Sequence, residues 1–291
     1  MSPMADSNGW PAPAKLNLML RITGRRPDGY HDLQTVFQLL DFGDRLNFKV
    51  RADGVIRKLN PPAGIPEDNG LAVRAARLLK GVTGTPLGAD ITLEKNLPLG
   101  GGVGGGSSDA ATTLVALNHL WHTGLDEDRL AELGRQLGAD VPVFVRGWSA
   151  WGEGIGERLS PLALPEQWYL VICPPIHIGT AALFSDPRLE RSMPPISRED
   201  FLNGVRGNAF EPVAVRQYPL IGKALDGLRP FGQPHLTGTG ACVFCAFSSR
   251  DAAEKALAAL PFDWKSFIAQ GVNVSPLKKQ LEGLRDVSRC I

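Results

Sequence analysis

Hydrophobic and polar positions alternate near the start of the chain, in the segment AKLNLMLRI at residues 14–22. Apolar residues occupy every even position, and Lys15, Asn17 and Arg21 fall on odd ones. A period of two predicts a strand with one buried face. Side chains two residues apart in a strand point the same way, so Lys15 and Asn17 are predicted to share the opposite face.

The same patterns predict further elements along the chain. Apolar or alternating runs predict strands at 33–40, 46–50, 89–95, 168–173, 241–247 and 267–270. Helical spacing predicts helices at 71–82, 110–120, 126–137, 197–204, 212–227 and 250–260, with a short apolar segment at 141–145. Strands and helices mix without strict alternation, which favours an α+β fold over a doubly wound sheet. The stretch 150–165 is rich in Gly and Pro and predicts a crossing between two lobes.

Composition narrows the class of protein. The 291 residues carry 31 Lys and Arg against 30 Asp and Glu, and 43% are hydrophobic. This balance is typical of a globular protein and argues against a nucleic-acid-binding one, which would need a basic excess. The start of the chain resembles neither a signal nor a transit peptide, and no apolar run is long enough to span a membrane. We therefore expect a cytoplasmic protein.

The four cysteines do not form a disulfide framework. Cys242 and Cys245 have the spacing of a redox or zinc motif, but they lie in the apolar run ACVFCAF, which predicts a buried strand. Residues i and i+3 of a strand point to opposite faces, so these two sulfurs are predicted to stay apart as core residues.

A glycine run at residues 100–108, GGGVGGGSS, is the strongest chemical signal. Glycine weakens helices and strands, so such a run makes sense where the backbone itself approaches a ligand. Ser107, Ser108 and Asp109 then offer N-cap chemistry to the helix predicted from Ala110. A glycine loop before a helix N-terminus is a site for phosphate groups. The alternative is a flexible linker.

Three familiar nucleotide motifs do not explain this run. No G-x-x-x-x-G-K-[ST] is present, so it is not a P-loop. Gly100, Gly102 and Gly105 match G-x-G-x-x-G, but a run this dense matches almost automatically, and a dinucleotide fold would place the motif early. The tripeptide Asp41–Phe42–Gly43 precedes the loop without any H-R-D, so we treat it as chance.

Three motifs in order resemble the GHMP kinase superfamily. They are PAKLNLML near the start, LPLGGGVGGGSSDAA as the phosphate loop, and LTGTGACVFCAF at residues 236–247. The resemblance implies two α+β lobes with the active site between them: an ATP-binding lobe at 1–160 and a substrate-binding lobe at 161–291. RPDGYHDLQTVFQ, LGADVPVF and NVSPL resemble members that phosphorylate the C2 hydroxyl of a cytidine-diphosphate polyol, 4-diphosphocytidyl-2-C-methyl-D-erythritol, in non-mevalonate isoprenoid synthesis.

The resemblance implies that Asp140 is the catalytic base and that Lys15 lies beside it. An aspartate can accept the hydroxyl proton as the oxygen attacks the γ-phosphorus. A nearby ammonium would favour the ionised aspartate and stabilise the developing negative charge. Asn17, on the same strand face, could hydrogen-bond the acceptor. From the residues alone, Asp140 could equally be a helix cap and Lys15 a solvated lysine.

The remaining implied contacts concern the two substrates. The resemblance assigns ATP to Asn69, Leu71, Lys95, Pro98, Leu99, Gly100, Gly101, Gly102, Val103, Gly104, Gly105, Gly106, Ser107 and Ser108. It assigns the acceptor to Asn17, Tyr30, His31, Thr180, Phe184, Gly238 and Gly240. The resemblance implies that Tyr30 stacks on the cytosine, that Phe184 is a second aromatic closing over it, and that His31 hydrogen-bonds it. From the residues alone, Tyr30 and His31 are an aromatic residue beside a turn and a surface histidine.

Some choices stay open at this stage. Phosphoryl transfer implies Mg²⁺, and Ser108 or Asp109 are the nearest candidate ligands, although Asp109 could instead be a helix cap. The alternative functions are another GHMP kinase, acting on mevalonate or homoserine, and a non-catalytic nucleotide-binding regulator. Nothing in the sequence fixes the oligomeric state.

Overall fold

A computed structural model describes residues 6–60 and 70–289 of the chain. Its strands form one continuous sheet with the order β3-β4-β2-β11-β7-β10-β9, to which β1, β5, β6 and β8 attach at the side through β2 and β1. The strands are β1 (Asp6–Arg25), β2 (His31–Arg51), β3 (Ile56–Lys58), β4 (Gly88–Glu94), β5 (Ala150–Gly154), β6 (Arg158–Pro161), β7 (Trp168–Cys173), β8 (Gly207–Asn208), β9 (His235–Leu236), β10 (Val243–Phe247) and β11 (Lys265–Val272).

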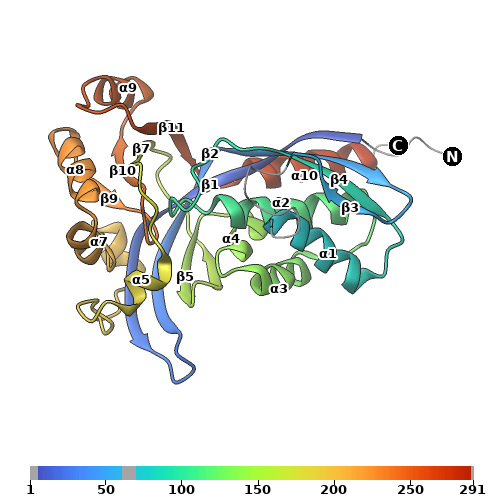
Figure 1. Cartoon of the computed structure of the whole chain (residues 1–291), viewed down its shortest axis with the longest axis horizontal. Coiled ribbons are helices and arrows are strands. Elements are labelled where there is room, and N and C mark those ends of the chain that lie inside the picture. Colours follow the sequence, from blue (N-terminus) through green and yellow to red (C-terminus); the bar gives the residue numbers. More distant parts are fainter. Residues whose placement is uncertain (1–5, 61–69, 290–291) are drawn as a thin grey trace.

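Helices cover the two ends of this sheet separately. α1 to α4 pack under β1, β2 and β4, whereas α5, α7, α8 and α9 gather around β7 and β10 (Figure 1). The helices are α1 (Leu71–Thr83), α2 (Gly105–Leu120), α3 (Glu127–Leu137), α4 (Val141–Arg146), α5 (Thr180–Ser185), α6 (Arg198–Leu202), α7 (Glu211–Gln217), α8 (Pro219–Leu228), α9 (Arg250–Ala258) and α10 (Pro276–Arg289). The α+β fold is confirmed. No helix in the described ranges is long and apolar enough to cross a membrane.

The apolar interior divides in the same way. One core joins the α1–α4 layer to β2 and β4 and includes Leu277 of α10; a second surrounds β7 and β10 on the other side. A third set, including Leu16 and Val103, links the even face of β1 to the glycine loop and to β7. The loop is therefore anchored by both ends of the sheet. The lobe boundary near residue 160 stays a prediction.

The first predicted strand is confirmed and is longer than its alternating segment. Ala14, Leu16 and Ile22 are fully buried along β1. The two strands predicted at 33–40 and 46–50 are wrong as separate elements, because β2 runs without interruption through the polar residues between them. Pairing with β1 continues there, with Pro13 opposite Gly43, so the partner strand carries the extended backbone across the polar segment.

Two helix predictions need correction, and a third segment is now assigned. α2 begins at Gly105, five residues before the predicted Ala110, so the last glycines lie within the first helical turn. The helix predicted at 212–227 is two helices, because Pro219 supplies no N–H and Tyr218 between them is extended. The apolar segment 141–145 is the short helix α4.

The prediction for the paired cysteines is confirmed. Cys242 packs in the core that reaches the glycine loop, and Cys245 packs in the core on the other side of the sheet. Cys242 instead meets Cys173 at the end of β7, with their sulfurs 2.8 Å apart. Cys173 was not connected with Cys242 in the sequence, because nothing in the pattern fixes which strand lies next to β10.

Candidate active site

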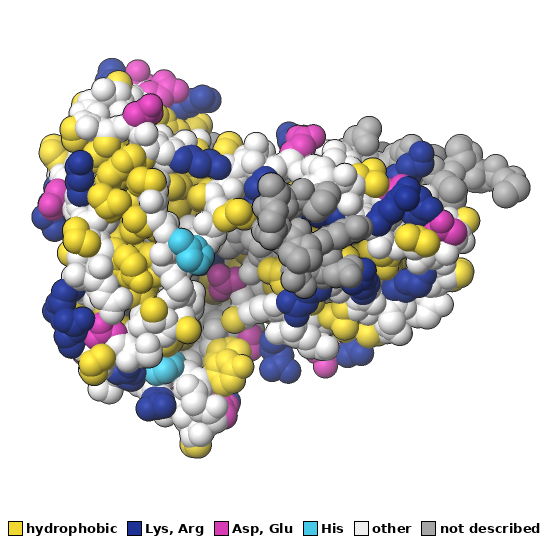
Figure 2. All heavy atoms as spheres, in the orientation of Figure 1, with side chains coloured by type: hydrophobic (Ala, Val, Ile, Leu, Met, Phe, Trp, Pro, Cys, Tyr) yellow, Lys and Arg dark blue, Asp and Glu magenta, His cyan; other side chains and the backbone are white. Residues whose placement is uncertain are grey.

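A cavity of about 910 Å³ lies where the two ends of the sheet meet. The space-filling surface is indented between the two parts of the molecule (Figure 2). The cavity wall comes from β1, the β1–β2 turn, the first part of β2, the glycine loop, the start of α4, and the loops before α5 and β10. These segments are far apart in the sequence, and the long β1–β2 pair brings them together.

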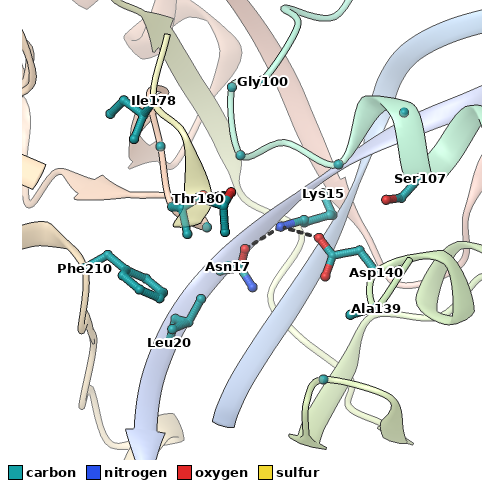
Figure 3. A pocket seen from close by; sticks show the side chains of 18 of the residues that line it. Lys15, Asn17, Leu20, Gly100, Ser107, Ala139, Asp140, Ile178, Thr180 and Phe210 are labelled. Atoms are coloured by element: carbon teal, nitrogen blue, oxygen red, sulfur yellow. Dashed lines mark hydrogen bonds and ion pairs between the residues drawn. The ribbon is translucent and has the colours of Figure 1, made fainter. Parts of the chain in front are cut away.

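Lys15 and Asp140 meet at the centre of the cavity. Their Nζ and Oδ2 atoms are 3.1 Å apart, and Lys15 Nζ also donates to Asn17 Oδ1 at 2.5 Å. Both contacts are drawn in Figure 3. The Lys15 side chain is only 2% exposed, so it is not the solvated lysine that is the usual case for this residue type. A buried ammonium needs such partners, and these two hold it in one place.

A hydrogen-bond network fixes this arrangement. Asn17 Nδ2 donates to Thr35 Oγ1 at 2.8 Å, and Thr35 Oγ1 donates to Met19 O at 2.7 Å. The Asn17 backbone N–H donates to Thr237 Oγ1 at 3.0 Å, which joins β1 to the loop before β10. Because every polar group here has a partner, Lys15 and Asn17 are held rigidly on the same face of β1, as the alternation predicted.

Asp140 occupies the N-cap position of α4, but its side chain makes no capping hydrogen bond. The carboxylate is 33% exposed and turns into the cavity toward Lys15. Pro142 in the first turn lacks an N–H, so that turn has fewer donors for a cap to satisfy. The carboxylate is thus available for chemistry in the cavity.

The glycine loop presents backbone N–H groups to the cavity. Gly104 is the N-cap of α2 with φ 76°, a left-handed conformation, and a Cβ there would lie 2.7 Å from Phe144 Cζ. Only glycine fits both requirements. The first helical residues, Gly105, Gly106 and Ser107, line the cavity, and their N–H groups precede the first intrahelical bond. They form an anion-binding helix N-terminus.

The loop before β10 clamps the glycine loop from the other lobe. Cys242 N–H donates to Gly101 O at 3.1 Å, and Thr237 Oγ1 donates to Gly102 O at 3.3 Å. A Cβ on Gly102 would lie 2.2 Å from Thr237 O, so the two backbones touch. Gly238 and Gly240 both line the cavity beside this contact.

The end of the predicted glycine motif differs from expectation. Ser108 N–H donates to Gly104 O at 2.8 Å as the first helical bond, so it is not free for phosphate, and the Ser108 and Val103 side chains are buried. Asp109 is not a helix cap: it lies inside α2 and pairs with Lys95. The capping prediction was wrong because the helix starts earlier than its apolar pattern.

The other nucleotide candidates fall at one end of the cavity. Leu71, Lys95, Pro98 and Leu99 line it, together with Gly100, Gly101, Gly102 and Gly104. Asn69 lies outside the described residues. Leu71 begins α1 and its δ1 carbon lies 3.2 Å from a Cβ placed on Gly106, so an apolar wall stands directly beside the helix N-terminus.

The acceptor candidates gather at the opposite end. The rings of His31 and Phe184 lie 5.0 Å apart, and Phe184 meets Phe210 edge-on at 4.8 Å. Burial, helped by the charges of Arg191 and Arg25, lowers the pKa of His31, so its imidazole is neutral near pH 7. His31 Nε2 is buried without a partner among the described residues, which leaves it free for a ligand.

Tyr30 and Thr180 complete this end. Tyr30 is 61% exposed at the tip of the β1–β2 turn, where it can close over a bound ring. Thr180 Oγ1 lies 3.0 Å from Thr239 Oγ1 at the lobe junction.

Several lining residues were missed in the sequence. They include Leu20, His177, Ile178, Phe210 and Thr239. Phe210 and Ile178 supply apolar walls that Figure 3 shows opposite β1. Leu20 lies in β1 on the face that the alternation assigns to the interior, and a register shift between Asn17 and Met19 interrupts the regular pairing just before it. No periodic signal marks the other four, because they lie in loops or beside the two-residue strand β8.

Comparison with known proteins agrees with this geometry. A family model described as "GHMP kinases N terminal domain" matches residues 70–147, and one described as "GHMP kinases C terminal" matches 185–266. A 4-diphosphocytidyl-2-C-methyl-D-erythritol kinase of Pseudomonas aeruginosa (strain LESB58) is 55% identical over 274 residues, which cover 94% of this chain and 97% of that protein. The chain belongs to the GHMP kinase family. The resemblance that the three motifs indicated is confirmed, and with it the use of ATP.

Other members support the same placement of this GHMP kinase. The Methylococcus capsulatus (strain ATCC 33009 / NCIMB 11132 / Bath) protein of the same name is 55% identical over 272 residues, covering 93% of this chain and 94% of that protein. A crystal structure of a 4-(cytidine 5'-diphospho)-2C-methyl-D-erythritol kinase superposes with a TM-score of 0.79 at 33% identity, covering 92% of this chain and all of that one. Homoserine kinase from Cytophaga hutchinsonii, at 14% identity and TM-score 0.70 over 94% of this chain and 97% of that chain, shares the fold.

Proposed function

We propose that this GHMP kinase transfers the γ-phosphoryl group of ATP to the C2 hydroxyl of 4-diphosphocytidyl-2-C-methyl-D-erythritol. The observation that carries the proposal is the order of chemical environments along the cavity. A helix N-terminus stands at one end, the Lys15–Asp140 pair at the centre, and an aromatic cluster around His31 at the other. A triphosphate, an alcohol and a nucleobase need these three environments in this order.

The central pair prepares the alcohol. Asp140 accepts the proton of the C2 hydroxyl as its oxygen attacks the γ-phosphorus, and the bond to the β-bridging oxygen breaks to release ADP. The Lys15 ammonium, 3.1 Å from the carboxylate, holds Asp140 in place and offsets negative charge on the attacking oxygen. Asn17 orients Lys15 and faces the acceptor's hydroxyls.

The glycine loop holds the triphosphate. The N–H groups of Gly105, Gly106 and Ser107 bind phosphate oxygens without rearrangement, because the helix already fixes them. Leu71 and Pro98 bound the space for the adenine. This placement supports the proposed ATP-binding lobe at residues 1–160.

Magnesium fits an oxygen donor set in the cavity. Ser107 lines it with its hydroxyl turned toward the Lys15–Asp140 pair, so Ser107 and Asp140 could hold the ion together with the phosphates. Among the described residues no three His, Cys, Asp or Glu side chains form a cluster that could hold a metal ion. When bound, Mg²⁺ would neutralise phosphate charge. Ser108 and Asp109, the candidates from sequence, face the interior instead.

The aromatic end selects the cytidine. Phe184 and Tyr30 can stack on the pyrimidine, and His31 Nε2 can hydrogen-bond its edge. Stacking on an aromatic side chain is worth about 1–3 kcal/mol per base. Mevalonate and homoserine carry no base to use these contacts. We also propose a reducing compartment such as the cytoplasm, because Cys173, Cys242 and Cys245 are buried thiols.

An acceptor panel tests this function. Purified enzyme would be given ATP and Mg²⁺ with the cytidine-diphosphate polyol, with mevalonate or with homoserine, and ADP release would be followed. We expect turnover with the first acceptor alone. Turnover only with mevalonate or homoserine would overturn the specificity, and ATP binding without turnover on any acceptor would indicate a regulator.

A further inference from the structure

A buried ion cluster lies behind the glycine loop. Lys95 Nζ is 2.6 Å from Asp44 Oδ2 and 2.9 Å from Asp109 Oδ2. The side chains of Asp44 and Asp109 are 0% and 7% exposed, and neither residue lines the cavity. Asp44 belongs to β2, Lys95 follows β4, and Asp109 lies in α2. The cluster therefore ties β2 and the end of β4 to the first turns of α2, behind the proposed nucleotide end of the cavity.

Asp44 uses both of its oxygens. While Oδ2 accepts from Lys95, Oδ1 accepts from the backbone N–H groups of Asn96 and Leu97, at 2.7 and 2.8 Å. These residues lead directly into Pro98 and the glycine loop. Anchoring the backbone needs only one acceptor oxygen, which an asparagine would also supply. The charge of Asp44 is thus directed at Lys95.

Lys95 carries a positive charge to the cavity wall. Although burial lowers it, the charges of Asp109 and Asp44 raise the pKa of Lys95 overall, so it stays protonated. Its Nζ lies 3.1 Å from where a Cβ on Gly105 would stand, beside the first residue of α2. One ammonium thus adds to the positive end of the helix at the point where its N–H groups are free.

We propose that Asp44 is a positioning residue for ATP that acts through Lys95. It holds the ammonium against the start of α2, so that Lys95 meets the nucleotide without first paying the entropy of a long flexible side chain. Without the carboxylate on β2, Asp109 is the one carboxylate partner of Lys95 that remains among the described residues, and the ammonium turns away from the cavity wall. The inference rests on the proposed function, because it takes the glycine loop as the ATP site.

The test compares four variants of the full-length protein. D44N keeps an oxygen for the two backbone N–H groups and removes the charge facing Lys95. K95M removes the ammonium, and the D44N/K95M double variant asks whether Asp44 acts through it. D90N is the matched control: Asp90 is a buried carboxylate on β4 that pairs with Arg51 and Arg57, away from the cavity. Calorimetric ATP affinity, both KM values, kcat and thermal unfolding are measured for each.

We expect D44N and K95M each to weaken ATP binding and raise KM for ATP about tenfold, while kcat and KM for the acceptor change less than about twofold. The double variant should bind ATP no more weakly than K95M, and D90N should match the wild type in ATP affinity, both KM values and kcat. Unchanged ATP affinity in D44N, multiplying effects in the double variant, or failure of D44N to fold would overturn the proposal. ATP calorimetry needs no acceptor, so the effect of D44N on ATP affinity can be interpreted even if the proposed acceptor is wrong.

Discussion

Replacing Asp140 with asparagine should stop phosphoryl transfer while leaving the protein folded and able to bind ATP. Asparagine has nearly the same shape and can still accept a hydrogen bond from Lys15, but it cannot take the hydroxyl proton. General-base catalysis contributes about 10²–10⁴-fold. At about 1.4 kcal/mol for each factor of ten, the barrier should rise by roughly 3–5 kcal/mol. We therefore expect kcat to fall at least 100-fold.

The structure argues that stability is spared. The Asp140 side chain makes no capping bond and is 33% exposed, and Lys15 keeps its 2.5 Å contact with Asn17. The amide oxygen of asparagine can take the place of the lost carboxylate oxygen as an acceptor, so the buried Lys15 ammonium keeps two partners. Thermal unfolding and ATP calorimetry should match the wild type. Asp128→Asn is the control, because Asp128 is 81% exposed and pairs with Arg146 on the surface. A kcat for D140N within about threefold of the wild type would remove Asp140 from the mechanism.

Three further changes probe other parts of the site. Gly104→Ala should weaken ATP binding at least tenfold and lower stability by about 1–3 kcal/mol, because alanine disfavours φ 76° and its Cβ would press on Phe144. ATP titration and thermal melts measure the two effects. An unchanged ATP affinity would contradict the prediction. Phe184→Ala should raise the acceptor's KM roughly 5–100-fold without changing the KM for ATP, since only the acceptor has a base to stack there; equal changes in both would refute the assignment. Burial raises the pKa of Asp109 to about 7, although the charge of Lys95 opposes this, so the folded state holds a proton that the unfolded chain loses at lower pH. As pH rises from 5 to 8, the free energy of unfolding of Asp109→Asn should therefore increase relative to that of the wild type. Denaturant titrations measure this difference, and a pH-independent difference would be inconsistent with the argument.

The sequence was most informative where a residue's role follows from local periodicity. Alternation in residues 14–22 placed Lys15 and Asn17 on one face of a strand before any fold was known, and the structure finds them hydrogen-bonded there. The density of glycines at 100–106 indicated a backbone that must approach a ligand, and Gly102 and Gly104 show that side chains would not fit. These features depend on backbone geometry, which a short segment encodes.

Predictions that depended on a partner segment were less accurate. The polar residues 41–44 looked like a break between strands, but Asp44 is buried because Lys95 and two backbone N–H groups satisfy it from β4's end. The start of α2 was misplaced because its glycines have low helix propensity, whereas packing against Leu71 and Leu97 holds that first turn. When the partners of a buried polar group come from a distant segment, the residues around that group in the sequence do not indicate them.

A crystal structure with a non-hydrolysable ATP analogue, Mg²⁺ and the cytidine-diphosphate polyol would test the central proposal most directly. We expect the γ-phosphate on the N–H groups of Gly105, Gly106 and Ser107, with the C2 hydroxyl within hydrogen-bonding distance of Asp140 and in line with the γ-phosphorus. A triphosphate bound away from the start of α2, or an acceptor whose C2 hydroxyl lies beyond reach of Asp140, would contradict it.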